Sequence, residues 1–244
     1  MADLHVSGRH ANRTTQLTAP NHTAFHLDNP WLRDVLRHGQ DSPFAYHFDI
    51  DWEAERLVLP FLPEPFEVLA ARGEVTVTAG PDPVMEVAGL RVPLDPETLY
   101  APPSSEADLL RLHEAQVWRL AHWMLERDGV THRRFFNVTG LVGMRVEEAA
   151  VFDDMHRLPL SLVDAGVVHG LRVDHIDGLA DPAGYLARLR AAVGDAPVWV
   201  EKILTRDEPL RPWPVQGTTG YEAARQITRL LTLPDGLMRL DADW

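Results

Sequence analysis

Three side chains in the last third of the sequence have the types and spacing for acid–base and nucleophilic chemistry. Arg172 and Asp174 are two residues apart in the segment GLRVD, so in a strand they share one face. Glu201 ends the next apolar segment, VWVE. Two carboxylates on neighbouring parallel strands can flank one glycosidic bond. A guanidinium beside Asp174 favours its ionised form, and the apolar neighbours Trp199 and Val200 favour a protonated Glu201.

Two simpler interpretations compete with this one. Arg-x-Asp is also the pattern of an ordinary structural ion pair, and only the addition of Glu201 one βα unit later favours catalysis. His175 and Asp177 lie near Asp174 and could contribute to a metal site, although Asp177-Gly178 is more simply a turn. The 12 histidines show no HExxH zinc spacing and the chain has no cysteine, so we expect no metal and no thiol nucleophile.

The surrounding pattern predicts the elements that position these residues. The segments VVHGLRVD and PVWVEKIL have the composition of buried strands. Between them, Asp181 can cap a helix that has Pro182 in its first position and Gly194 just past its end. Its apolar face is expected to consist of Tyr185, Leu186, Leu189 and Val193. Strand, helix and strand in this order form a βαβ unit, which implies parallel strands and an α/β fold.

Upstream, the helical signals are less regular. The segment VEEAAVFDDMHRLPLSLVDAG predicts a helix with a kink or break at Pro159. Ser105 with Asp108 resembles a capping box, and the apolar spacing extends that helix to Gly129, with Trp118 and Trp123 in the core. Between residues 55 and 103 the prolines are too dense for long helices, so short strands such as GEVTVTAG are expected.

Composition limits the classes of partner. The 244 residues are 45% apolar and 24% charged, as in soluble globular proteins, and the net charge of -13 disfavours nucleic acid but suits a neutral sugar. No apolar run is long enough for a signal peptide or a membrane span. We therefore expect a soluble, cytoplasmic protein without a membrane or nucleic-acid partner.

Several long segments resemble the maltooligosyltrehalose synthases of the α-amylase superfamily. The resemblance covers about residues 20 to 244 and rests on GLRVDHIDGLADPAGYLARLR, VWVEKIL, WPVQGTTGYE, NHTAFHLDNPWLRDVLRHGQDSPFAYHFDIDW and THRRFFNVTGLVGMRVE. It implies an isomerase of trehalose biosynthesis that needs no cofactor. The implied substrate is a maltooligosaccharide or glucan, whose reducing-end α-1,4 linkage is converted to an α,α-1,1 linkage.

The resemblance also implies roles for individual residues. Asp174 matches the family's nucleophile, Glu201 its general acid/base and Arg172 the arginine partner. The residues expected to contact the substrate are Asn21, His22, His175, Lys202 and Tyr221. Glu201 would protonate the terminal linkage while Asp174 attacks the anomeric carbon, and the released glucose would then return through its anomeric hydroxyl.

The chain departs from the family pattern in ways that predict an incomplete barrel. Leu17 occupies a position where the superfamily has an aspartate, and TTQLTAP has little apolar content for a barrel strand. No carboxylate on a later strand matches the third catalytic acid. We therefore expect an α/β fold, an incomplete (β/α)8 TIM-type barrel with an inserted subdomain. The expected domains are a degenerate third barrel strand with its loop (1–54), the insertion (55–134) and the βαβ catalytic segment (135–244).

Three functional expectations follow from this organisation. Residues 1–244 by themselves are expected to have little or no synthase activity, because the barrel is incomplete and a transition-state carboxylate is missing. Exposed strand edges predict a partner chain that covers them. The alternatives are a noncatalytic remnant or fragment that binds glucan, and a metal-dependent hydrolase that uses His22, Asp174 and His175.

Overall fold

The computed structural model describes residues 6–10, 13–126, 129–205, 207–233 and 236. The chain divides into two compact units, one of residues 21–152 and one that joins the N-terminal segment up to Pro20 with residues 153–244. These boundaries differ from the predicted divisions after residues 54 and 134. The predicted divisions describe parts of a barrel, which the two compact units do not test, and they remain a prediction. In the described residues no helix is both long and apolar enough to cross a membrane.

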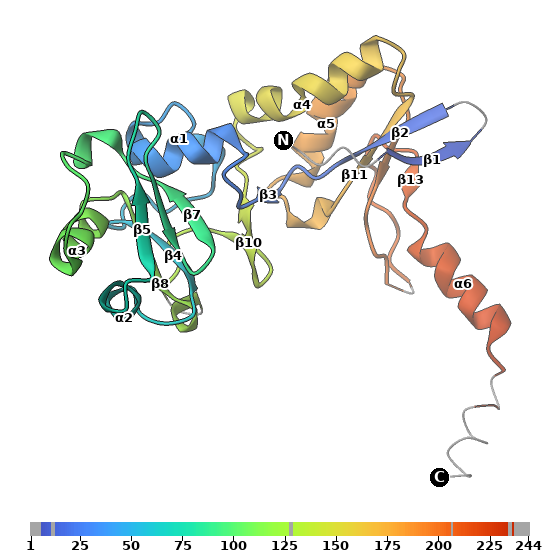
Figure 1. Ribbon diagram of the computed structural model, residues 1–244. Coiled ribbons are helices and arrows are strands. Elements are labelled where there is room, and N and C mark those ends of the chain that lie inside the picture. The colour runs from blue at the N-terminus through green and yellow to red at the C-terminus, as the bar shows by residue number, and fades with distance from the viewer. Residues whose placement is uncertain (1–5, 11–12, 127–128, 206, 234–235, 237–244) are drawn as a thin grey trace. The chain divides into compact units, whose positions relative to one another are not determined.

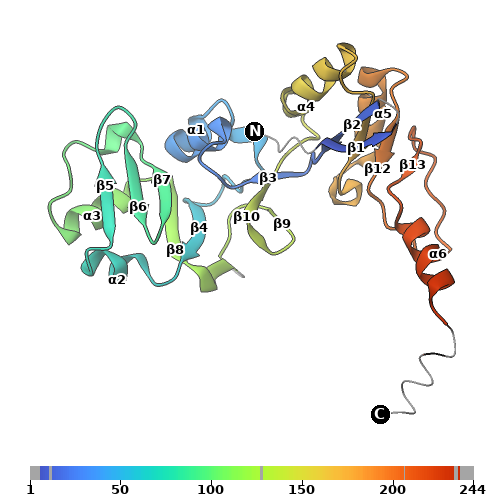
Figure 2. The ribbon, with the colours of Figure 1, turned by 45° about the vertical axis from the view of Figure 1, so that its right-hand side comes forward.

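The first unit is a mixture of small sheets and short helices (Figures 1 and 2). Its elements are β3 (His22–Ala24), α1 (Pro30–His38), β4 (Leu57–Leu62), α2 (Phe66–Ala71), β5 (Val75–Thr78), β6 (Val84–Val87), β7 (Leu90–Pro93), α3 (Glu106–Glu114), β8 (Trp118–His122), β9 (Arg134–Phe135) and β10 (Val138–Gly143). Short 3-10 turns lie between them at Gly39–Asp41, Ala45–His47, Pro96–Thr98 and Trp123–Glu126. Strands β5, β6 and β7 form an antiparallel sheet, which confirms the expectation of short strands in this proline-rich segment.

The helix predicted from Ser105 to Gly129 is shorter than expected. Ser105 caps it as predicted, because its hydroxyl accepts a hydrogen bond from the Asp108 backbone N–H at 3.2 Å. The helix ends at Glu114, and Trp118–His122 is instead a strand that pairs in parallel with β4. The apolar strand β4 needs a partner for its backbone groups, and this pairing overrides the helical spacing. Trp118 is buried as predicted, but Trp123 is 54% exposed.

The second unit is an α/β layer built on one five-stranded sheet (Figure 1). Its elements are β1 (Val6–His10), β2 (Arg13–Thr18), α4 (Ala149–Asp164), β11 (Gly170–Val173), a 3-10 turn (Ile176–Gly178), α5 (Pro182–Val193), β12 (Val198–Val200), β13 (Gly217–Thr218) and α6 (Tyr221–Leu231). The order is β1-β2-β11-β12-β13; β1 is antiparallel to β2, and the strands from β2 to β13 are parallel. The predicted α/β class is therefore confirmed for this unit.

The predicted βαβ unit is present with its signals in place. Asp181 caps α5 by accepting a hydrogen bond from the Gly184 N–H at 2.9 Å, and Gly194 follows the helix with a positive φ of 59°. The predicted apolar face of α5 is buried. Helix α4 is continuous through Pro159 and does not break there. His156 of α4 lies 2.8 Å from the Tyr185 hydroxyl, which joins α4 to α5.

Close contact between β11 and β12 depends on Gly170. A Cβ atom at this position would lie 2.9 Å from the Pro197 carbonyl oxygen and from the Trp199 ring. Any side chain here would push the two strands apart. The register that pairs Arg172 with Trp199 and Val173 with Val200 therefore requires a glycine at the start of β11.

We predict that Asp181→Ala destabilises the second unit by about 1 kcal/mol, because the amino end of α5 loses its side-chain acceptor. Urea denaturation followed by circular dichroism measures this loss. Asp181→Asn is the matched control: it keeps an acceptor oxygen, so its unfolding should differ from the unchanged chain by less than half as much. Equal losses in both variants would contradict the capping role.

Candidate active site

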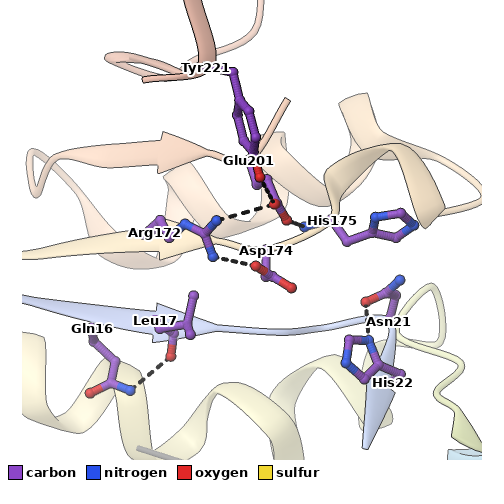
Figure 3. A network of polar contacts seen from close by, with 9 residues as sticks. All are labelled: Gln16, Leu17, Asn21, His22, Arg172, Asp174, His175, Glu201 and Tyr221. Carbon is purple, nitrogen blue, oxygen red and sulfur yellow. Dashed lines mark hydrogen bonds and ion pairs between the residues drawn. The ribbon is translucent and has the colours of Figure 1, made fainter. Parts of the chain in front are cut away.

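Arg172 joins the two predicted carboxylates. Arg172 and Asp174 extend from β11 on one face, and Glu201 follows the last residue of β12 (Figure 3). One guanidinium nitrogen donates to Asp174, and another lies 3.5 Å from Glu201 Oε1. The three side chains are only 21–23% exposed. The cation is thus shared between two half-buried carboxyl groups at the carboxyl ends of adjacent parallel strands.

Glu201 has two further hydrogen-bond donors. The backbone N–H of His175 donates to Oε2 at 2.9 Å, and the Tyr221 hydroxyl donates to Oε1 at 2.8 Å (Figure 3). Tyr221 is the first residue of α6, so it reaches Glu201 from a separate element. Every donor in this set stabilises the ionised form of Glu201.

The backbone of His175 has an unusual conformation. Its φ of 44° and ψ of 50° lie in the left-handed region, which is uncommon for residues with a side chain. This conformation ends β11 sharply and starts the turn Ile176–Gly178. Strained backbone of this kind concentrates at functional sites. Here it orients the N–H of His175 toward Glu201.

The electrostatics of the two carboxyls differ from the sequence prediction. Burial raises the pKa of Asp174, its direct interaction with Glu201 adds to this, and Arg172 opposes both. Burial also acts to raise the pKa of Glu201, but the hydrogen bonds from His175 and Tyr221, with Asp174 and Arg172, outweigh it and lower the pKa. The two pKa values therefore shift in the directions opposite to those predicted from the neighbouring residues, upward for Asp174 and downward for Glu201. The apolar neighbours Trp199 and Val200 predict a raised pKa for Glu201. The pKa is lowered instead, because His175, Tyr221 and Arg172 all direct donors at this carboxylate.

Lys202 is also fully engaged. Its ammonium lies 3.1 Å from Asp177 Oδ2 and 3.0 Å from Glu208 Oε1. The hydrogen bond to Glu208, followed by that to Asp177, raises the pKa of the ammonium, so Lys202 stays charged. Within the described residues, no group of three or more His, Asp or Glu side chains is arranged to hold a metal ion.

The second unit therefore brings together six of the eight predicted site residues. Asn21 and His22 belong to the first unit, where the His22 ring nitrogen Nδ1 lies 2.8 Å from the Asn21 side-chain oxygen. The His22 ring lies against the Phe135 ring in a tilted arrangement, with centroids 4.0 Å apart and an interplanar angle of 33°. Asp177 and Glu208 are polar partners of Lys202 that the sequence does not predict. The sequence indicates a turn or a metal ligand at Asp177, and no local signal links Glu208 to Lys202.

The neighbour of Arg172 on β2 is Leu17. The two residues are partners in the parallel register of β2 and β11. Leu17, which stands where the superfamily pattern has an aspartate, thus places an apolar side chain beside the Arg172 guanidinium (Figure 3). The short strand TTQLTAP nevertheless pairs with β11, so its low apolar content did not prevent strand formation.

Comparison with known proteins gives one consistent result. No protein-family model matches the chain. The putative maltooligosyl trehalose synthase of Mycobacterium tuberculosis strain H37Rv is 40% identical over 219 residues, which are 88% of this chain and 26% of that protein.

Solved structures agree with the sequence comparison. The maltooligosyltrehalose synthase of Arthrobacter ramosus matches with a TM-score of 0.79 and 39% identity, over 90% of this chain and 28% of that one. The DSM5389 glycosyltrehalose synthase matches with a TM-score of 0.82 and 34% identity, over 93% of this chain and 31% of that one. The chain is therefore a relative of the maltooligosyltrehalose synthases, and it spans about a quarter to a third of their length.

Proposed function

We propose that this chain carries the reacting carboxylates of an intramolecular transglucosylase that acts on maltooligosaccharides. The observation that carries the proposal is the pair Asp174 and Glu201, held by one arginine at the ends of adjacent parallel strands. Retaining glycosidases use two carboxyl groups in this arrangement. The relatives named above supply the substrate class, since their names specify maltooligosyl trehalose synthesis.

In the first proposed step, Glu201 protonates the oxygen of the reducing-end α-1,4 linkage. An Asp174 oxygen attacks the anomeric carbon, the glycosidic C–O bond breaks, and a glycosyl ester forms. In the second step, Glu201 takes the proton from the anomeric hydroxyl of the released glucose. That oxygen attacks the anomeric carbon of the glycosyl ester, the bond from this carbon to the Asp174 oxygen breaks and frees the carboxylate, and an α,α-1,1 linkage forms without net consumption of water. Water in the site would instead give hydrolysis.

The proposed first step needs the proton on Glu201, whereas the contacts of the two carboxyls raise the pKa of Asp174 and lower the pKa of Glu201. Two interacting carboxyls share one proton and titrate as a pair. A sugar bound between them would end their direct interaction and would accept hydrogen bonds that Glu201 now receives. Both changes favour protonation of Glu201 and ionisation of Asp174 beside Arg172. We propose that substrate binding sets the proton in this way.

The remaining site residues have proposed roles that follow from the family. Asn21, His22 and His175 are proposed to contact the sugar. Tyr221 is proposed to act on substrate through Glu201, which it already contacts. We also propose that the parallel strands β2, β11, β12 and β13 are consecutive strands of a (β/α)8 barrel, with residues 55–134 as an insertion.

Binding of glucan without catalysis is the second candidate function, and Leu17 favours it. A carboxylate at this position is part of the superfamily pattern, and here its place beside Arg172 is apolar. Isothermal titration with maltopentaose, together with a search for nonreducing product, separates the candidates. Saturable binding without product supports the binding function, and product formation supports the transglucosylase.

We predict that both carboxylates are required for any conversion of maltopentaose. Asp174→Asn should abolish formation of the glycosyl ester, and Glu201→Gln should lower kcat by about 10²- to 10⁴-fold. Product analysis and mass spectrometry of the trapped ester are the measurements. Asp195→Asn, which changes an exposed carboxyl of the same unit, should leave conversion unaffected. Conversion that survives Asp174→Asn, or that is lost on addition of EDTA to the unchanged protein, would refute the mechanism.

We further predict that Tyr221→Phe raises the pKa of Glu201, because it removes a hydroxyl donor from the ionised carboxylate. Carbon-13 NMR of labelled glutamate carboxyls measures the titration. Since the lowered pKa favours the folded state above the ordinary titration range, the variant should also lose part of its stability at neutral pH. Tyr100→Phe, at a tyrosine that is 94% exposed, is the control and should change neither quantity.

A further inference from the structure

Lys202, directly after Glu201, is the only lysine in the chain, which has 22 arginines. All the remaining Lys or Arg positions of the chain hold arginine, so this position differs from them in the type of its cation. Arginine presents a broad, planar fork, whereas the lysine ammonium is a compact point charge with three donors on a flexible stem. The choice indicates a site whose geometry suits the smaller group.

The surroundings of Lys202 have this geometry. Two carboxylates from different loops approach the ammonium at 3.0 and 3.1 Å, and the side chain is only 12% exposed. Asp177 belongs to the turn Ile176–Gly178 that follows β11, and Glu208 belongs to the loop that follows β12. The second oxygen of Glu208 accepts a hydrogen bond from the Thr205 N–H at 3.2 Å. Lys202 thus connects the loops that follow the two carboxylate-bearing strands.

The connection reaches Glu201 through the backbone. The turn that contains Asp177 directly follows His175. The backbone of His175 is left-handed, and its N–H donates to Glu201 Oε2. Asp177 is the middle residue of this turn, so its contact with Lys202 ties the turn to the residue that follows Glu201. The Asp177 side chain is 52% exposed and that of Glu208 is 32% exposed, so what the ammonium supplies is chiefly the connection between the two loops. We infer that the loops would separate without it. The hydrogen bond from His175 to Glu201 would then lengthen.

We propose that Lys202 is a positioning residue, whose ammonium locks the turn after Asp174 to the loop after Glu201 and thereby holds the His175 N–H against Glu201. This assigns Lys202 a role different from direct contact with the sugar, which the family resemblance implied. The proposal rests on the proposed function for its kinetic consequences only. The structural part concerns the titration of Glu201 and can be measured without turnover.

The test compares Lys202→Met with Lys202→Arg in the whole chain. Lys202→Met should raise the pKa of Glu201, measured by carbon-13 NMR of the labelled carboxyl. Lys202→Arg keeps the charge but not the compact geometry, so it should restore the pKa only in part. With maltopentaose, Lys202→Met should lower kcat by about 10- to 100-fold and change KM by less than about 2-fold, because a displaced reacting group lowers the rate more than binding.

Controls and contrary results separate this role from the others. Arg72→Met removes an exposed ion pair with Glu64 in the first unit and should change neither the pKa nor the kinetics. An unchanged Glu201 pKa in Lys202→Met would overturn the proposal. So would full restoration by arginine, which would indicate a charge effect alone, or a rise in KM with unchanged kcat, which would indicate sugar binding. Residues 1–244 by themselves are expected to show little turnover, so if the unchanged chain shows none, the NMR comparison alone decides the role of Lys202.

Discussion

The arrangement of the second unit depends on one cation that is shared by two carboxylates. Arg172 contacts both Asp174 and Glu201, so one guanidinium serves two carboxyl groups in a half-buried place. Removing the cation would leave two carboxylates facing each other, which costs far more than the loss of a surface ion pair. The pairing is possible only while β11 and β12 keep their register, and Gly170 and the capped helix α5 maintain that register. The packing of this unit therefore determines whether Arg172 can contact both carboxyls, and so affects their pKa values.

The sequence predicts this unit well because its signals are local. Asp181, Pro182 and Gly194 mark the ends of α5 within a few residues, and the apolar strands on either side have no competing pattern. The segment after Ser105 failed because its outcome depends on β4, which lies more than forty residues earlier. Helical spacing continued to Trp123, but β4 required a parallel partner and took Trp118–His122. The apolar spacing of a segment indicates which local element it favours, but it does not show that a strand far away in the sequence will pair with it.

The same distinction explains the pKa values. The sequence places Trp199 and Val200 beside Glu201, and apolar neighbours raise the pKa of a carboxyl. It does not show that the His175 backbone N–H and the Tyr221 hydroxyl both end at Glu201, since one depends on a left-handed residue and the other on the position of α6. Backbone donors leave no side-chain signature. Residue types predicted which groups meet, and only geometry gave the direction in which each is shifted.

A site whose polar groups satisfy one another has a consequence for binding. Glu201 has its hydrogen-bond donors within the protein, and Arg172 contacts two carboxylates. On the proposed function, a sugar would exchange these contacts for its own, and each exchange of one hydrogen bond for another changes the free energy by little. Net affinity therefore has to come from apolar and hydroxyl contacts away from the reacting bond. The change of contacts at Asp174 and Glu201 can then alter which of the two carboxyls is protonated. The free energy of sugar contacts remote from the reacting bond would in this way support the chemical step. On the proposed function, this separation lets substrate binding favour the protonated form of Glu201.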